Sequence, residues 1–192
     1  IYSVEKFLMA RRFMYWQVYL HKTGVVAEQL LISILKRARF LIKNGTTLNC
    51  SKALLYFLSQ HIDKSNFDRV TLAKFAKLDD VDILAALKEW QYADDFVLST
   101  LCEMILNRKL LDIKLKKEPI NETKFKNKFN KIKKLYKLTD EETSYFVFTG
   151  ELKNKAYDRE HQNINILRKN GKITDVAKLS DHLNLNALSK TV

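Results

Sequence analysis

Apolar residues recur at helical spacing through most of the first 108 residues. The first such pattern opens at Ser3, a helix-capping residue type, continues past Gly24 and ends in lysines and arginines followed by Gly45. It predicts one helix of about forty residues or two nearly collinear helices. Further helices are predicted over residues 51–60, in two segments of residues 66–90, and over residues 94–109.

The spacing changes after Arg108. Residues 109–120 alternate between apolar and polar side chains, which predicts a strand that ends at Pro119. The remaining predictions are a helix over 121–138, a strand over 144–150, and a hairpin over 163–180 that turns at Asn170 and Gly171. We therefore expect a mainly α fold with a small C-terminal α+β lobe, divided into residues 1–112 and 113–192.

The composition limits the classes of protein to which this chain can belong. The chain has 192 residues, of which 46% are hydrophobic and 29% charged, enough for a medium domain or a domain with a small lobe. No apolar run approaches the ~18 residues of a membrane helix, and the N-terminus does not resemble a signal peptide. Cys50 and Cys102 show no CxxC spacing, which favours reduced thiols and a cytoplasmic location. Because the chain opens on Ile1, we also expect an excised piece of a longer protein.

The chain is strongly basic. Its net charge of +12 and its pI near 9.6 favour anionic partners, which include nucleic acid and phosphorylated small molecules. The four histidines are scattered, no His-Asp doublet occurs, and neither a glycine-rich phosphate loop nor a GxSxG motif is present. The sequence thus predicts no metal site and no catalytic residue within this chain.

The best candidate for binding lies in residues 10–24. On a helix, Arg11, Tyr15, Tyr19 and Lys22 share one arc, whereas Met9, Phe13, Trp16 and Leu20 lie near the opposite side. Arginine and lysine bind phosphate, and tyrosine stacks on a sugar or base, so this face suits a nucleotide. The alternative is that the tyrosines are half-buried packing residues whose neighbouring cations reach solvent.

The helix over residues 121–138 is the second candidate. Its lysines between Lys124 and Lys137 could contact a phosphate backbone or an acidic surface. The pattern favours the ordinary alternative, in which these lysines are the solvated face of an amphipathic helix whose apolar stripe contains Phe125, Phe129, Ile132 and Tyr136. Residues 139–142 form a capping box that predicts the start of a short helix.

The chain resembles the C-terminal half of the bacterial HD-domain phosphohydrolases, which are similar to deoxynucleoside triphosphate triphosphohydrolases. The residues that carry this resemblance are 2–38, with the pattern RR...Y.HK, and 78–90, 93–111 and 145–157. It implies an HD-like helical core and hydrolysis of a deoxynucleoside triphosphate to deoxynucleoside and triphosphate. It also implies a divalent metal cofactor, bound by a His-Asp doublet and further ligands that would precede this chain. The isolated chain would then be inactive.

The resemblance also implies roles for single residues. Arg11 and Tyr19 match residues that contact substrate phosphate and sugar, and Tyr15 stands where relatives often place a histidine that reaches the triphosphate. His21, Lys22 and Arg108 match residues that contact an activating nucleotide at a subunit interface, which implies a homo-oligomer. In this interpretation Met9, Phe13, Trp16 and Leu20 pack into the helical core. Two rival functions are a non-enzymatic module that binds nucleic acid through Lys124 to Lys137, and an oligomerisation segment that pairs through the first helix.

Overall fold

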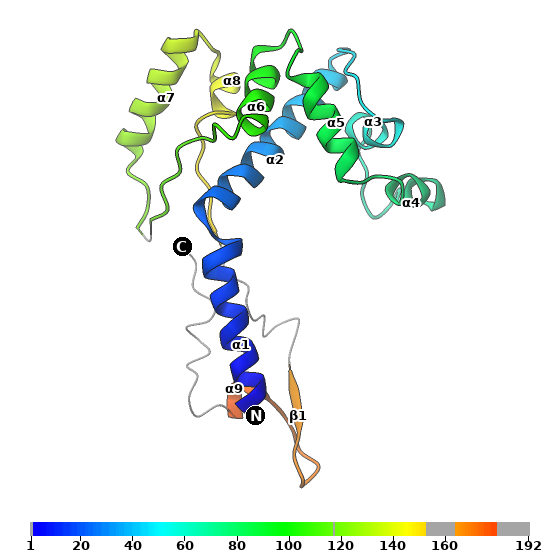
Figure 1. Ribbon diagram of the computed structural model, residues 1–192, viewed down its shortest axis with the longest axis vertical. Helices are drawn as coiled ribbons and strands as arrows, with labels where there is room; N and C mark the ends of the chain where they lie inside the picture. The colour runs from blue at the N-terminus through cyan, green and yellow to red at the C-terminus, as the bar shows by residue number, and fades with distance from the viewer. Residues whose placement is uncertain (1, 117, 153–163, 180–192) are drawn as a thin grey trace. The chain divides into compact units, whose positions relative to one another are not determined.

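Helices dominate the computed structural model, which describes residues 2–116, 118–152 and 164–179 (Figure 1). The helices are α1 (Tyr2–Met14), the π-helix η1 (Tyr15–Tyr19), α2 (Lys22–Lys43), α3 (Lys52–Ser59), α4 (Arg69–Phe75), α5 (Asp80–Trp90), α6 (Phe96–Leu106), α7 (Glu122–Tyr136), α8 (Asp140–Ser144) and α9 (Val176–Leu179). Strands β1 (Asn165–Leu167) and β2 (Ile173–Asp175) form an antiparallel sheet. The predicted fold class, mainly α with a small sheet near the C-terminus, is confirmed.

The chain divides into two compact units. Unit 1 comprises residues 1–25, 113–128 and 148–192, and unit 2 comprises residues 26–112 and 129–147. The predicted division into residues 1–112 and 113–192 stays a prediction. Long-range packing explains why each unit combines segments that are distant in the chain, because Tyr145 and Phe146 pack on the core of unit 2 and Leu8 packs with Val176 in unit 1.

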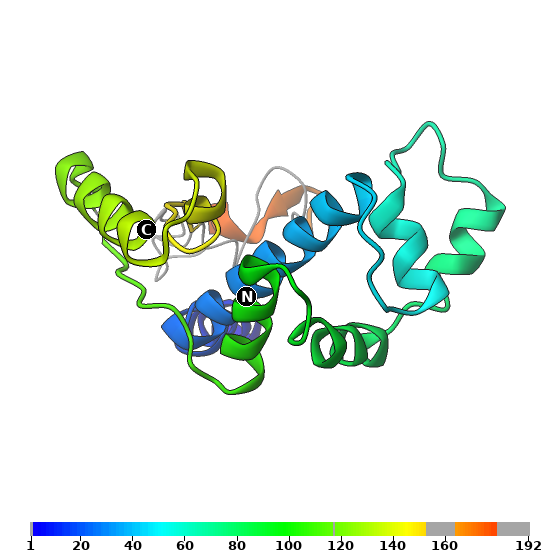
Figure 2. The same cartoon turned by 90° about the horizontal axis from the view of Figure 1, so that it is seen from above.

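The core of unit 2 forms around one stripe of α2. Leu30, Ile34 and Ala38 recur at helical spacing on this helix and are fully buried. They pack with apolar residues of α3, α5 and α6, and α2 and α6 lie side by side in both views (Figures 1 and 2). Trp90, at the end of α5, is 2% exposed and donates a hydrogen bond from Nε1 to the carbonyl oxygen of Asn49 at 2.9 Å.

Polar side chains define where the helices of unit 2 begin. Their N-cap residues each accept a hydrogen bond from a backbone N–H of the first turn, which otherwise has no partner within the helix. These caps are Ser51 on α3, Asp68 on α4, Asp79 on α5, Asp95 on α6 and Thr139 on α8. The predicted capping box of residues 139–142 is therefore confirmed.

Unit 1 has a small core on one side of α1. Leu8 is 2% exposed and Val176 is fully buried, with Val4, Ile164 and Ile166 packed against them. The hairpin turns where predicted, since Gly171 adopts a φ of +78° that favours glycine and Asn170 Oδ1 accepts a hydrogen bond from the N–H of Lys172.

The predicted burial of one side of α1 is wrong for the described residues. Phe13 and Trp16 are 52% and 38% exposed, and Met9 and Leu20 are only half-buried. The side that packs is the one with Val4 and Leu8, because the partners in this unit come from the segment around the hairpin.

Two predicted strands are also wrong. Residues 111–116 do alternate in burial, but the described part of the chain offers no strand to pair with them. Residues 145–147 form a turn after α8, in which the N–H groups of Tyr145 and Phe146 donate to the carbonyls of Glu142 and Thr143. Their aromatic run reflects packing of Tyr145 and Phe146 on the helical core.

Candidate functional site

The structure brings the three predicted substrate-binding residues together. The guanidinium carbon of Arg11 lies 5.6 Å from the centroid of the Tyr15 ring, and the Tyr15 and Tyr19 rings are 5.0 Å apart with planes inclined by 57°. Arg11 and Tyr15 are half-buried, whereas Tyr19 is 60% exposed. We call these residues the Arg11 ladder. The ladder places a cation beside two rings, one of which is exposed, along one side of α1 and η1.

A change of helix type accompanies this ladder. After Met14 the α-helix widens into the π-helix η1, in which the N–H of Leu20 donates to the carbonyl of Tyr15 at 2.7 Å, five residues earlier. Tyr15 and Tyr19 are the first and last residues of this π-helix. The periodicity of the chain did not indicate this change.

His21 and Lys22 lie at the start of α2 and are exposed. The carbonyl of His21 accepts the first hydrogen bond of α2, from the N–H of Val25 at 3.0 Å. Its Nδ1 accepts a further hydrogen bond from the N–H of Thr23 at 3.3 Å, which requires this nitrogen to be unprotonated. His21 thus caps α2, a structural role that the sequence pattern did not indicate.

Arg108, the third predicted regulatory residue, belongs to unit 2 and not to the unit of His21 and Lys22. It follows α6 in the left-handed region, with a φ of +56°. Its N–H donates to the carbonyl of Ile105, and the N–H of Lys109 donates to Met104, which is the Schellman pattern of helix termination. The exposed side chain of Arg108 therefore projects from a backbone position that usually holds glycine.

The most buried charged side chain of unit 2 is Arg37, which the sequence analysis did not single out. The side chain of Arg37 is 6% exposed, and its Nε and Nη2 donate to the two carboxylate oxygens of Asp95 at 3.0 and 2.6 Å. Burial of Asp95 would raise its pKa, but the hydrogen bonds from Arg37 and from the N–H of Leu98 lower it. The hydrogen bond to Asp95 likewise raises the pKa of Arg37 above its ordinary value.

The sequence did contain a signal for this pair. Arg37 falls on the same face of α2 as Leu30 and Ile34, a position where an unpaired cation would be costly. Its aromatic neighbours are Phe40 and Tyr145, whose ring centroids lie 5.1 and 5.5 Å from the guanidinium carbon. The pair holds α2 and α6 together and does not form an open binding site.

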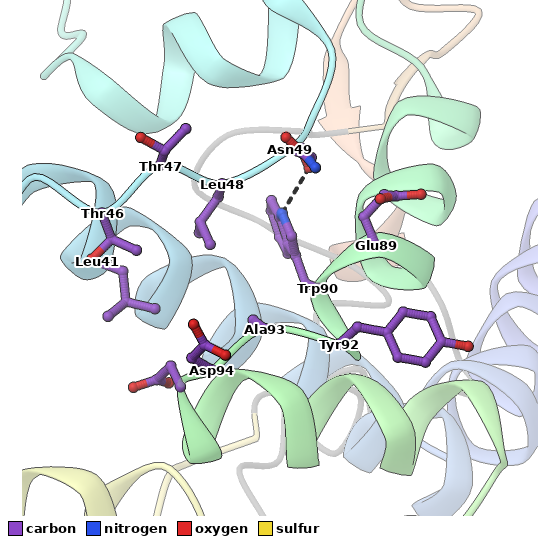
Figure 3. A pocket seen from close by; sticks show the side chains of 11 residues that line it. Leu41, Thr46, Thr47, Leu48, Asn49, Glu89, Trp90, Tyr92, Ala93 and Asp94 are labelled. Carbon is purple, nitrogen blue, oxygen red and sulfur yellow. Dashed lines mark hydrogen bonds between the residues drawn. The ribbon is translucent and has the colours of Figure 1, made fainter.

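Unit 2 also contains a shallow pocket of about 310 Å³ (Figure 3). Three carboxylates border it, from Glu89, Asp94 and Asp95. Asp95 is paired with Arg37, but the charges of Glu89 and Asp94 oppose the binding of phosphate, so this pocket is a poor candidate for a nucleotide site. It is lined by Leu41, residues 46–49, Glu89, Trp90 and residues 92–95.

Metal ligands are not gathered in the described residues. No group of three or more His, Cys, Asp or Glu side chains within residues 2–116, 118–152 and 164–179 is placed to hold an ion. On the surface, Nε2 of His61 lies 3.8 Å from Oδ2 of Asp63. His161 and His182 lie outside the described residues. Both cysteines are free thiols, and burial raises the pKa of Cys102 to about 12.

No protein-family model matches the chain. The uncharacterized protein YwfO of Bacillus subtilis (strain 168) is 27% identical over 187 residues, which cover 94% of this chain and 41% of that protein. A crystal structure of a phosphohydrolase from Bacteroides thetaiotaomicron VPI-5482 matches 100% of this chain and 48% of its own, with 43% sequence identity and a TM-score of 0.83. This chain is similar to a phosphohydrolase. It spans less than half the length of either relative.

Among the described helices, none combines the length and the apolar composition that crossing a lipid bilayer requires. The similarity to a phosphohydrolase bears on the whole chain, because it extends over both units.

Proposed function

We propose that this chain is part of a metal-dependent HD-type phosphohydrolase that acts on nucleotides, with deoxynucleoside triphosphates as substrates. The identity of 43% to a phosphohydrolase over the whole chain supports the hydrolase. The proposal of a nucleotide as substrate rests on the Arg11 ladder, which combines a guanidinium with two neighbouring phenol rings. The products would be a deoxynucleoside and triphosphate.

The members of the ladder would have different roles. The Arg11 guanidinium would donate to phosphate oxygens, for which its planar arrangement of N–H groups is well suited. Tyr19, which is 60% exposed, would contact the sugar through its ring and hydroxyl. Tyr15 lies between them and would orient both, because it contacts the guanidinium on one side and the second ring on the other.

The divalent metal of this proposal does not fit the residues described here. They contain no cluster of three suitable donors, so the ion would be bound by residues outside the described part of the chain. We therefore assign no chemical step to these residues beyond binding and orienting the substrate. By itself the chain is expected to show no turnover.

The proposal is tested with the full-length protein, deoxynucleoside triphosphates and manganese, by chromatographic detection of nucleoside and triphosphate. Arg11→Ala is expected to raise KM about 10- to 100-fold, because it removes a charged hydrogen bond to phosphate. Arg12→Ala is the matched control, since Arg12 lies about 100° around the helix from Arg11. Unchanged KM and kcat in Arg11→Ala and Tyr19→Leu would refute the proposed substrate roles.

We further propose that His21, Lys22 and Arg108 contact an activating nucleotide, and that the protein is a homo-oligomer. His21→Asn is the informative variant, because asparagine is a good N-cap residue and would keep the start of α2 intact. It is expected to abolish activation by added nucleotide while basal turnover persists. Sedimentation of the full-length protein, with and without nucleotide, measures the assembly.

A further inference from the structure

The β1–β2 hairpin carries two exposed aliphatic side chains beside its turn. Leu167 and Ile173 are 70% and 65% exposed, and they are direct partners in the register of the hairpin. Opposite residues of an antiparallel pair point to the same face of the sheet. Because side chains alternate along a strand and Ile166 packs on the core of unit 1, Leu167 and Ile173 point away from that core. A face in contact with water is usually polar, so this aliphatic pair is unusual.

Cations lie next to this pair. Arg168 directly follows Leu167, Lys172 directly precedes Ile173, and Lys169 lies in the turn between them. All three cations are exposed. Residues 164–174 contain no acidic side chain. The end of the hairpin, residues 167–173, therefore combines two aliphatic side chains with three positive charges, and we call it the hairpin tip.

Hydrogen bonds fix the shape of the hairpin tip. The N–H of Arg168 donates to the carbonyl of Lys172 at 3.0 Å, and the N–H of Gly171 donates to the carbonyl of Arg168 at 2.9 Å. At the base of the hairpin, the N–H of Val176 donates to the carbonyl of Ile164 at 2.9 Å, and Val176 is fully buried. The base is thus held on the core of unit 1 while the tip is open to solvent. Because the tip is already ordered, little conformational entropy is lost when it binds a partner.

We propose that the hairpin tip docks on an anionic lipid surface, a peripheral contact that needs no membrane-spanning helix. The cations would lie among the headgroups, where anionic lipids attract lysine and arginine. Leu167 and Ile173 would enter the boundary between headgroups and acyl chains, which removes their exposed area from water. This activity goes beyond the proposed hydrolysis, since the tip shares no residue with the Arg11 ladder or with the proposed site for an activating nucleotide.

The composition of the tip favours lipid over other partners. Nucleic acid would attract the cations, but residues 167–173 include no aromatic ring on which a base could stack, and a phosphate backbone offers nothing to the aliphatic pair. The tip of a second copy would bring like charges together. Addition of a partner strand is disfavoured, because β1 and β2 have only three residues each. A layer of negative charge above an apolar layer matches both parts of the tip.

The expected affinity is modest. Three cations close to an anionic surface strengthen binding about 100-fold. Leu167 and Ile173 add a further factor of about 10 to 100, because much of their surface is exposed and can be transferred from water. We therefore expect reversible binding with a partition constant on the order of 10⁴ M⁻¹, comparable to that of a single myristoyl chain.

The experiment uses the full-length protein and vesicles of phosphatidylcholine, with or without phosphatidylserine. Sedimentation of the vesicles measures the bound fraction over a range of salt concentrations. Vesicles with phosphatidylserine are expected to bind about 100-fold more tightly, and salt should reduce this difference. Lipids with brominated acyl chains should quench the emission of Leu167→Trp more strongly than that of the wild type, because the new ring would reach the acyl chains.

One set of variants tests the cations. The triple variant Arg168→Gln, Lys169→Gln and Lys172→Gln should weaken binding to the anionic vesicles about 100-fold. The matched control replaces by glutamine three lysines that are exposed on helices of unit 2, and it should lose much less affinity. These are Lys43, Lys52 and Lys88.

A second set tests the aliphatic pair. The double variant Leu167→Thr and Ile173→Thr should weaken binding about 10- to 100-fold, while threonine preserves the strands through its high β propensity. The matched control is Val81→Thr and Leu84→Thr, at positions of α5 that are 69% and 52% exposed. It should bind the vesicles like the wild type.

Several outcomes would overturn the proposal. One is equal binding to vesicles with and without phosphatidylserine, and another is a control variant that weakens binding as much as the matching tip variant. A third is tighter binding of an oligonucleotide or of polyglutamate through the three cations, unaffected by the threonine variant, since the tip would then bind soluble polyanions. Loss of vesicle binding in the tip variants with unchanged nucleotide turnover would support a lipid contact that is separate from hydrolysis.

Discussion

Replacing Asp95 by Asn is expected to destabilise unit 2, because it leaves the charge of Arg37 without its main partner. The Arg37 side chain is 6% exposed and that of Asp95 is 18% exposed, so solvent replaces the lost interaction poorly. Asparagine has nearly the same shape and can still accept the hydrogen bond from the N–H of Leu98, which Asp95 accepts at 2.8 Å. The substitution therefore removes the ion pair and keeps the cap of α6.

The size of the effect follows from the surroundings of Arg37. Removing one partner of a buried ion pair costs about 3–5 kcal/mol. Glu142 and Glu141 lie 3.6 and 3.9 Å from the guanidinium and compensate in part, so we expect the lower end, about 3 kcal/mol. Asp95→Ala should cost about 1 kcal/mol more, because it also removes the cap.

The assay is urea unfolding of the protein, followed by tryptophan fluorescence. Trp90 is buried in the core of unit 2, and replacing the exposed Trp16 by Phe leaves Trp90 as the reporter. The pKa of Asp95 is lowered in the folded state, so its contribution is present above the unfolded value of about 3.9 and is lost as the pH falls through the lower folded value. The difference between wild type and Asp95→Asn should be full at neutral pH and shrink below about pH 4.

Two results would refute this reasoning. One is a free energy of unfolding for Asp95→Asn within about 0.5 kcal/mol of the wild type at neutral pH, which is the range of ordinary surface substitutions. The other is a difference that persists unchanged in acid. The double variant Arg37→Met and Asp95→Asn should be more stable than Asp95→Asn alone, because it has no unpaired buried charge.

Three further substitutions test local features by thermal or urea unfolding. Gly24→Ala should stabilise α2 by about 0.5–1 kcal/mol, because a Cβ there meets only the carbonyl of Val18 at 3.9 Å; a loss of stability would contradict this. Arg108→Gly should stabilise unit 2 by about 0.5–1 kcal/mol by relieving its φ of +56°, whereas Asn107→Gly, at a φ of −91°, should not. Tyr56→Phe should cost about 1 kcal/mol by removing the hydrogen bond to buried Thr71 at 2.9 Å, and equal loss in the exposed control Tyr92→Phe would exclude this cause.

The sequence determined the helices of unit 2 with good accuracy. Their apolar stripes and N-cap residues are local signals, since a cap acts within its own first turn and a stripe needs only helical geometry. The capping boxes at Asp79 and Thr139, the glycine at the end of α2 and the turn at Asn170–Gly171 all belong to this class. In the candidate site, the spacing of Arg11, Tyr15 and Tyr19 placed them on one face, and the structure brings them into contact.

Tertiary structure decided the features that depend on distant partners. Alternation over residues 109–116 did not make a strand, because a strand needs a second segment for its hydrogen bonds. The side of α1 that packs depends on Val176 and Ile164, more than 150 residues away in the chain. Asp95 serves as a cap by local geometry, but its partner Arg37 lies 58 residues earlier, and only the fold places that guanidinium against it.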